Sequence, residues 1–246
     1  YDNAFRMCFS DPNQGSASAD YIADNNLAKK VAVIYNSSDT YSSGIYQNFV
    51  TEAEKKGLEV VAAKAFTADN KTDFSVQIQK AKDAGAELVF LPIYYQEASL
   101  ILAQANKAGF SPKWFGCDGM DGILDLEGFD ASLAENLMFL TPFTANATDD
   151  ATQKFVADFK DAFGDTPIQF AADAYDAVYI VKAAIEKSGV TPADSVSDIC
   201  EGLKKAITEL SFDGLTGTGI TWSANGEPNK EPSVVVIKNG VYEEMK

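Results

Sequence analysis

The chain has 246 residues, of which 46% are hydrophobic and 23% charged, a composition typical of a soluble globular protein with one large or two modest domains. Its 36 acidic and 20 basic residues give a net charge of -16, which repels nucleic acids and anionic membrane surfaces and argues against both as partners. Histidine is absent, so Ser-His-Asp and Cys-His catalysis are excluded and the commonest transition-metal ligand is missing.

Membrane and metal signals are weak. No run of about 18 apolar residues encodes a membrane span, so we expect no direct membrane insertion. No leader sequence is visible, so we expect an exported protein to be seen here in mature or trimmed form. Cys8, Cys117 and Cys200 are odd in number and lack metal-binding spacing, and no spacing of acidic residues demands a metal.

Short apolar runs alternate with helix-period segments from Lys30 onward. We expect strands at 30–35, 58–66, 86–94, 113–118 and 135–143. Helices are expected between them, beginning near Tyr41, Asp73 and Gln96 and stopped by Gly57, Gly85 and Gly109. Strands joined through single helices form right-handed βαβ units, which predicts an α/β fold with a parallel sheet covered on both faces.

The alternation of apolar runs and helix-period segments ends at residues 143–148, which we interpret as a crossing between domains. Helices are expected at about 149–163, 170–188 and 195–210, and short strands follow around the turns Asn225-Gly226 and Asn239-Gly240. The helical stretch has no strand of its own, so its apolar faces must pack on something else. We expect it to be half of a domain.

Nucleotide-binding motifs are missing from the turns that follow the predicted strands. Neither G-x-G-x-x-G nor G-x-x-x-x-G-K-[ST] is present, and the loop at 36–44 has a single glycine, placed late. The sequence therefore predicts neither a dinucleotide nor a P-loop site, and we expect no cofactor.

Aromatic and acidic side chains stand where the predicted strands end. Tyr41 opens the first helix, Tyr94 and Tyr95 follow the third strand, and Asp118 follows the fourth. In parallel sheets ligands bind outside the carboxyl ends of the strands. Alone, each tyrosine is more often core filler and the aspartate a helix cap. Their shared edge favours a site for an amine, because a carboxylate beside aromatic rings suits an ammonium group.

Several stretches together resemble the substrate-binding proteins of branched-chain amino acid ABC transporters, which have the type 1 periplasmic binding protein fold. They are "FRMCFSDPNQG" at 5–15, "SDTYSSG" at 38–44, "PIYYQE" at 92–97, "FGCDG" at 115–119, "QFAADAY" at 169–175 and "GLTGTGITWSANGEP" at 214–228. The resemblance spans nearly the whole chain.

The resemblance implies two Rossmann-like lobes with parallel sheets, joined by three crossing segments, that close on an amino acid. Residues 1–143 and 208–246 would form the second, C-terminal lobe, and 144–207 the helical remainder of the first, N-terminal lobe. Members usually carry about a hundred additional residues before "FRMCFSDPNQG", so the first lobe is expected to be incomplete in this chain.

The resemblance also implies the roles of four residues. Tyr41 resembles a second-lobe tyrosine beside the ligand, and Tyr94 and Asp118 resemble the partners of the ligand's α-ammonium group. Phe170 resembles an aromatic residue that approaches the pocket from the first lobe. Related sequences often carry glutamate at the position of Asp118, so the fit of the ligand here is expected to differ. No catalytic residue is implied.

The expected function is that of an extracytoplasmic solute-binding protein, either periplasmic or lipid-anchored at the cell surface. It would capture a free amino acid, branched-chain or similar, and deliver it to the membrane permease of an ABC importer. A ligand-sensing domain of a signalling receptor is the alternative, because it can share this fold. An enzyme acting through Asp118 is disfavoured by the missing histidine and cofactor motifs. The sequence does not define the ligand's side chain.

Overall fold

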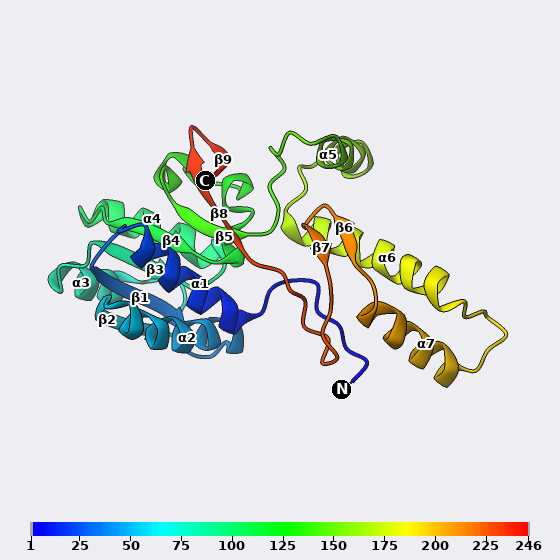
Figure 1. Ribbon diagram of the computed structural model, residues 1–246. Coiled ribbons are helices and arrows are strands. Elements are labelled where there is room, and N and C mark those ends of the chain that lie inside the picture. The colour runs from blue at the N-terminus through cyan, green and yellow to red at the C-terminus, as the bar shows by residue number, and fades with distance from the viewer. Residues whose placement is uncertain (1, 246) are drawn as a thin grey trace. The chain divides into compact units, whose positions relative to one another are not determined.

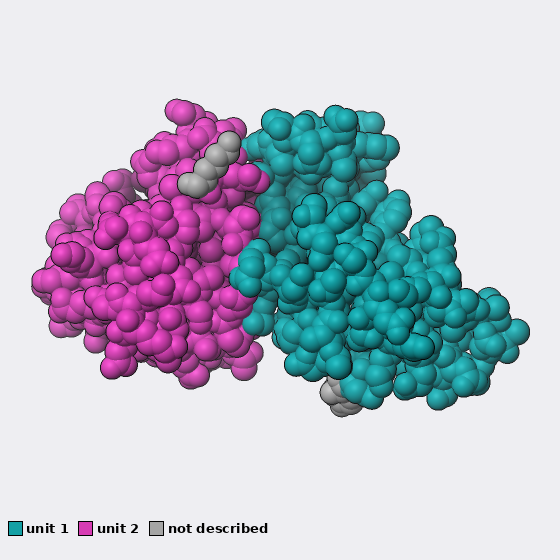
Figure 2. Space-filling view, in the orientation of Figure 1, with its two compact units in different colours: residues 1–10, 142–231 teal, residues 11–141, 232–246 magenta. Residues whose placement is uncertain are grey.

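The computed structural model describes residues 2–245 and divides the chain into two compact units (Figure 2). The sheet unit consists of residues 11–141 and 232–246, and the helical unit of residues 1–10 and 142–231. Each unit is described by itself below.

The sheet unit contains a seven-stranded sheet in the order β2-β1-β3-β4-β5-β8-β9 (Figure 1). Five strands run parallel: β1 (Lys30–Asn36), β2 (Glu59–Phe66), β3 (Leu88–Leu91), β4 (Lys113–Gly116) and β5 (Met138–Thr141). Two antiparallel strands complete one edge: β8 (Ser233–Lys238) and β9 (Val241–Glu244). The predicted parallel α/β sheet is therefore confirmed.

Helices cover both faces of this sheet. They are α1 (Asp11–Asp24), α2 (Thr40–Lys56), α3 (Ser75–Asp83) and α4 (Tyr95–Lys107), with short 3₁₀ turns η1 (Asp118–Met120), η2 (Ile123–Asp125) and η3 (Ala131–Ala134). On one face Phe49 of α2 stacks on Phe90 of β3, with ring centroids 4.2 Å apart. On the other face, Ile34 of β1 belongs to a buried cluster with residues of α3 and α4. Coverage of both faces explains the nearly continuous apolar strands.

Helix α1 was not expected from the sequence, and close packing explains it. A side chain at Gly15 would place its Cβ 2.4 Å from the carbonyl oxygen of Ile45, so α1 lies almost backbone to backbone against α2. This contact depends on the absence of a side chain rather than on an apolar stripe, which is why hydrophobic periodicity does not reveal it.

The helical unit contains α5 (Asp150–Phe163), α6 (Gln169–Ser188) and α7 (Val196–Thr208), in close agreement with the expected helices. Its only sheet among the described residues is the pair β6 (Phe212–Gly214) and β7 (Gly217–Ile220). Ile180 of α6, Ile207 of α7 and Trp222 belong to one of its buried clusters. Meanwhile α6 leaves Val178 and Val181 exposed by 68% and 46%, so its apolar faces are only partly covered.

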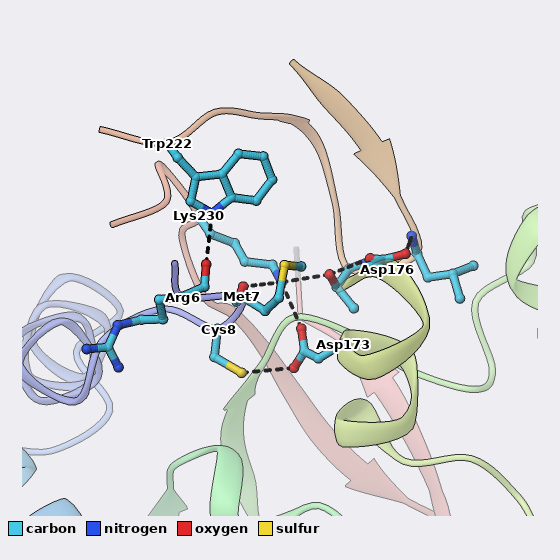
Figure 3. Close-up of polar contacts among 9 residues, drawn as sticks. Arg6, Met7, Cys8, Asp173, Asp176, Trp222 and Lys230 are labelled. Atoms are coloured by element: carbon cyan, nitrogen blue, oxygen red, sulfur yellow. Dashed lines mark hydrogen bonds and ion pairs between the residues drawn. The ribbon is translucent and has the colours of Figure 1, made fainter. Parts of the chain in front are cut away.

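The boundaries of the two units differ from the expected division. Residues 1–10 and 208–231 were expected in the lobe with the sheet but lie in the helical unit. Long-range polar contacts hold them there (Figure 3). The indole nitrogen of Trp222 donates to the carbonyl oxygen of Arg6 at 2.8 Å, and Lys230 forms a buried ion pair with Asp173 of α6 at 2.9 Å.

The two predicted turns differ in geometry. Asn239 and Gly240 both have positive φ, 51° and 74°, as a tight hairpin between β8 and β9 requires. In the other turn Gly226 alone of the pair has positive φ. A Cβ there would lie 1.9 Å from the carbonyl oxygen of Ala4, so the N-terminal segment also requires this glycine.

Candidate functional site

Three of the four predicted site residues come together at the carboxyl edge of the parallel strands in the sheet unit. Tyr41 lies in the first turn of α2, where the side chain of Asp39 caps the helix by accepting a hydrogen bond from the Tyr41 amide at 3.1 Å. Tyr94 is the residue just before α4, and Asp118 begins η1 two residues after β4 ends. The βαβ order therefore brings three distant segments to one edge.

The hydroxyl of Tyr41 joins these segments. It donates to Oδ1 of Asp118 at 2.6 Å and accepts from the backbone amide of Gly119 at 3.1 Å. The rings of Tyr41 and Tyr94 stack with centroids 4.9 Å apart and an angle of 24° between their planes. The result is one carboxylate held beside two phenol rings.

Burial governs the electrostatics of this cluster. Asp118 is only 7% exposed, and burial raises the pKa of its carboxyl, opposed by the hydrogen bond from Tyr41. Burial, followed by the negative charge of Asp118, raises the pKa of Tyr41 well above its usual value. Tyr41 therefore keeps its proton at neutral pH and remains the donor to Asp118.

This arrangement is suited to binding a cation. A positive charge beside Asp118 favours its ionised form and so offsets the burial that raises its pKa. Tyr94 remains 42% exposed while its ring stacks on Tyr41, so the pair presents an aromatic surface next to the carboxylate. Such a surface attracts an ammonium group through the quadrupole of the ring.

Gln14 and Gly119 belong to the cluster, although neither is among the site residues predicted from the sequence. The side-chain oxygen of Gln14, in α1, accepts a hydrogen bond from the amide of Asp118 at 3.1 Å, and Gln14 is 1% exposed. A Cβ at Gly119 would lie 2.9 Å from the Tyr41 hydroxyl. The glycine directly after Asp118 in "FGCDG" was the available signal, because a glycine often marks close packing.

Phe170, the fourth predicted residue, belongs to the other compact unit, the helical one. It is the second residue of α6 in the helical unit and is 42% exposed. Its role toward a ligand stays a prediction.

Within residues 2–245, no three or more Cys, Asp or Glu side chains cluster in a way that could hold a metal ion. No described helix combines the length and apolar character needed to cross a membrane.

A parallel α/β sheet with a carboxylate and aromatic rings at its carboxyl edge is typical of α/β domains that bind small molecules. Residues 1–241 match the periplasmic binding protein family, and the chain belongs to this family. The family is one of solute-binding proteins, not of enzymes.

Individual relatives within this family are named as binding proteins for leucine or other branched-chain amino acids. The chain is 31% identical over 242 residues to Leu/Ile/Val-binding protein homolog 3 of Brucella melitensis. It superposes on a leucine-binding protein of Thermotoga maritima with a TM-score of 0.82 at 28% identity, covering 98% of this chain and 67% of that one. A branched-chain amino acid transporter substrate-binding protein of Streptococcus pneumoniae, in complex with isoleucine, gives a TM-score of 0.83 at 27% identity, with 98% and 66% coverage. The type 1 fold is confirmed.

The chain spans only part of the length of the relatives that it matches. The aligned region comprises 96% of this chain but 61% of the Brucella protein.

Proposed function

We propose that this protein is an extracytoplasmic solute-binding protein that captures a free amino acid and delivers it to the membrane permease of an ABC importer. The observation that carries the proposal is the buried carboxylate of Asp118, bonded to Tyr41 and lying beside the stacked rings of Tyr41 and Tyr94. In this proposal the carboxylate binds the α-ammonium group of the amino acid, and Tyr94 contributes the aromatic surface.

A branched-chain or similar amino acid is the proposed ligand. The names of the relatives support this choice, because the Brucella protein is a Leu/Ile/Val-binding protein homolog and the Thermotoga protein is a leucine-binding protein. The solved relative from Streptococcus pneumoniae holds isoleucine. We propose a periplasmic location, or a lipid-anchored one at the cell surface, because the chain belongs to the periplasmic binding protein family. These relatives favour an importer over a signalling receptor.

An exposed apolar stripe on α6 supports the proposal that the helical unit is part of the first lobe. Its α6 exposes Val178, Val181 and Ile185, which recur at helical spacing on one side. Such a stripe is typical of a helix that covers a sheet. We propose that the sheet unit corresponds to the second lobe and the helical unit to part of the first, with Phe170 on the ligand side.

Calorimetry on the protein expressed from its complete gene tests this proposal. Leucine, isoleucine and valine are each titrated, with glutamate and arginine as charged controls. Saturable binding of at least one branched-chain amino acid, at least about ten-fold tighter than either charged control, supports the proposal. Absence of binding by all five, from protein first stripped of bound ligand by unfolding and refolding, would contradict it.

A further inference from the structure

The sheet unit contains a cavity that lies away from the candidate site. It has a volume of about 650 Å³ and is lined by residues at the starts of β4 and β5 and at the end of β8, which runs antiparallel to β5. Lys113 and Trp114 begin β4, and Asp118 follows the other end of the same strand. We call this space the N-edge cavity, because it opens at the amino edge of the parallel strands.

Apolar side chains form the inner wall of the N-edge cavity. Trp114, Met138 and Val236 contribute from three adjacent strands, and Leu102 contributes from α4. All four are buried, between 2% and 9% exposed. Phe110 contacts Trp114 edge to face, with ring centroids 6.3 Å apart, which holds the indole in place. The wall therefore suits an alkyl or aromatic body.

Positive charge predominates at the opening. Lys113 donates to the carbonyl oxygen of Leu27 at 2.6 Å, and Lys238 donates to the side-chain oxygen of Asn136. Within residues 2–245 neither lysine forms an ion pair with a carboxylate. Glu135 also lines the cavity, but its carboxylate accepts a hydrogen bond from the Asn239 amide at 2.9 Å. Two lysines and one glutamate leave a net charge of +1 in a chain whose net charge is -16.

We infer that the N-edge cavity is a second ligand site, which binds a hydrophobic monocarboxylate with its chain against Trp114 and Met138 and its carboxylate between Lys113 and Lys238. The volume lies within the range of roughly 300–1,000 Å³ that is typical of small-molecule sites. A lysine that contacts only neutral oxygens gains a charge-assisted hydrogen bond from an incoming carboxylate. An amino acid is a poor occupant, because its ammonium group faces these lysines.

Trp114 provides a direct readout, because the chain has two tryptophans and the second, Trp222, lies in the helical unit. The probe is 10-bromodecanoate, whose bromine quenches indole fluorescence on contact. In the Trp222→Phe protein, which reports Trp114 alone, we expect saturable quenching below about 1 mM probe. In the Trp114→Phe protein we expect no saturable quenching. If Trp222→Phe does not fold, the wild type compared with Trp114→Phe gives the same difference.

Charge variants test the recognition of the carboxylate. Combining Lys113→Gln with Lys238→Gln should weaken 10-bromodecanoate binding by about ten-fold or more. Lys80→Gln, which removes a lysine of α3 that does not line the cavity, should leave binding unchanged. Decanol, with the same chain but no charge, should compete at least about ten-fold less well than decanoate.

Two further outcomes separate this site from the proposed amino acid site. Saturating leucine should leave the quenching of Trp114 unchanged, and Asp118→Asn should do the same. Quenching that never saturates, that is equal for both tryptophans, or that is insensitive to the lysine variants would overturn the inference. The amino acid calorimetry is independent of all these results.

Discussion

The hydroxyl of Tyr41 lies 2.6 Å from Oδ1 of Asp118, although 77 positions separate the two residues in the chain. The same hydroxyl accepts a hydrogen bond from the Gly119 amide, so it connects the start of α2 to the turn after β4. The hydrogen bond thus fixes the orientation of the carboxylate. For the proposed amino acid ligand, preorganisation of this kind would reduce the cost of binding.

Tyr41→Phe should weaken amino acid binding by about 1–2 kcal/mol, because Asp118 loses a hydrogen bond that favours its ionised form. The pKa of Asp118 should rise further, which NMR titration of its carboxyl carbon measures. Tyr46→Phe is the matched control, because Tyr46 stacks on Tyr35 at 4.0 Å and has no part in the cluster. Equal affinity for wild type and Tyr41→Phe would contradict the role of the hydroxyl.

Gly119→Ala should disturb the cluster without changing its charge. The added methyl would lie 2.8 Å from the carbonyl oxygen of Ile93 and 2.9 Å from the Tyr41 hydroxyl, so Tyr41 has to move. We expect amino acid affinity to fall about ten-fold or more. Gly44→Ala, at the fifth residue of α2, meets no atom within 4 Å and should instead stabilise the helix by about 0.5–1 kcal/mol. Calorimetry and thermal unfolding together distinguish the two.

Asp118→Asn should stabilise the ligand-free protein at neutral pH. Because burial raises the pKa of Asp118 in the folded state, the folded state holds this proton more tightly than the unfolded state. Ionisation therefore lowers the free energy of unfolding as the pH rises from about 3.9 through the raised pKa, and this loss persists above it. We expect a higher Tm for Asp118→Asn than for wild type at pH 7 and nearly equal values near pH 3.5. A lower Tm for Asp118→Asn than for wild type at pH 7 would contradict this, because it would show that the Asp118 charge does not destabilise the folded state.

Lys230→Met should destabilise the helical unit strongly. The ion pair with Asp173 is almost fully buried, with side chains 3% and 7% exposed, and Lys230 also donates to Thr216 at 2.6 Å and to the carbonyl oxygen of Met7 at 3.0 Å (Figure 3). Removing one partner leaves a buried charge unpaired, at a cost of about 3–5 kcal/mol.

Urea unfolding followed by circular dichroism measures this cost. Lys204→Met is the control, because Lys204 pairs with the exposed Asp2 at the surface and its loss should change stability little. Equal midpoints for Lys230→Met and wild type would show that Asp173 finds another partner. The double variant Lys230→Met with Asp173→Leu should recover part of the lost stability.

The convergence of Tyr41, Tyr94 and Asp118 could be predicted from the sequence because it follows from topology. Each residue stands directly after or near the end of a strand, and parallel strands direct their carboxyl ends to one edge. Only the order of strands and helices is needed for this inference. The helix-ending glycines were equally readable, since Gly57 has the positive φ of 74° that such an end requires.

Gln14 and the unit boundaries depend on contacts that no local pattern reports. Gln14 lies on α1, whose packing rests on the missing side chain of Gly15 rather than on an apolar stripe. The placement of residues 208–231 depends on the Lys230–Asp173 ion pair, whose members are 57 positions apart. An isolated lysine in a polar loop looks like any surface lysine until the fold brings its partner to it.

The central claim is that Asp118 binds the ammonium group of an amino acid. Comparing leucine with an analogue that lacks the amino group tests this claim most directly. Leucine and 4-methylpentanoate, which is leucine without its amino group, are titrated calorimetrically into wild type and Asp118→Asn protein made from the complete gene. We predict that wild type prefers leucine and that Asp118→Asn loses about 2–3 kcal/mol of leucine affinity with a much smaller change for 4-methylpentanoate. An unchanged preference for leucine in Asp118→Asn would contradict the assignment of Asp118 as the ammonium partner.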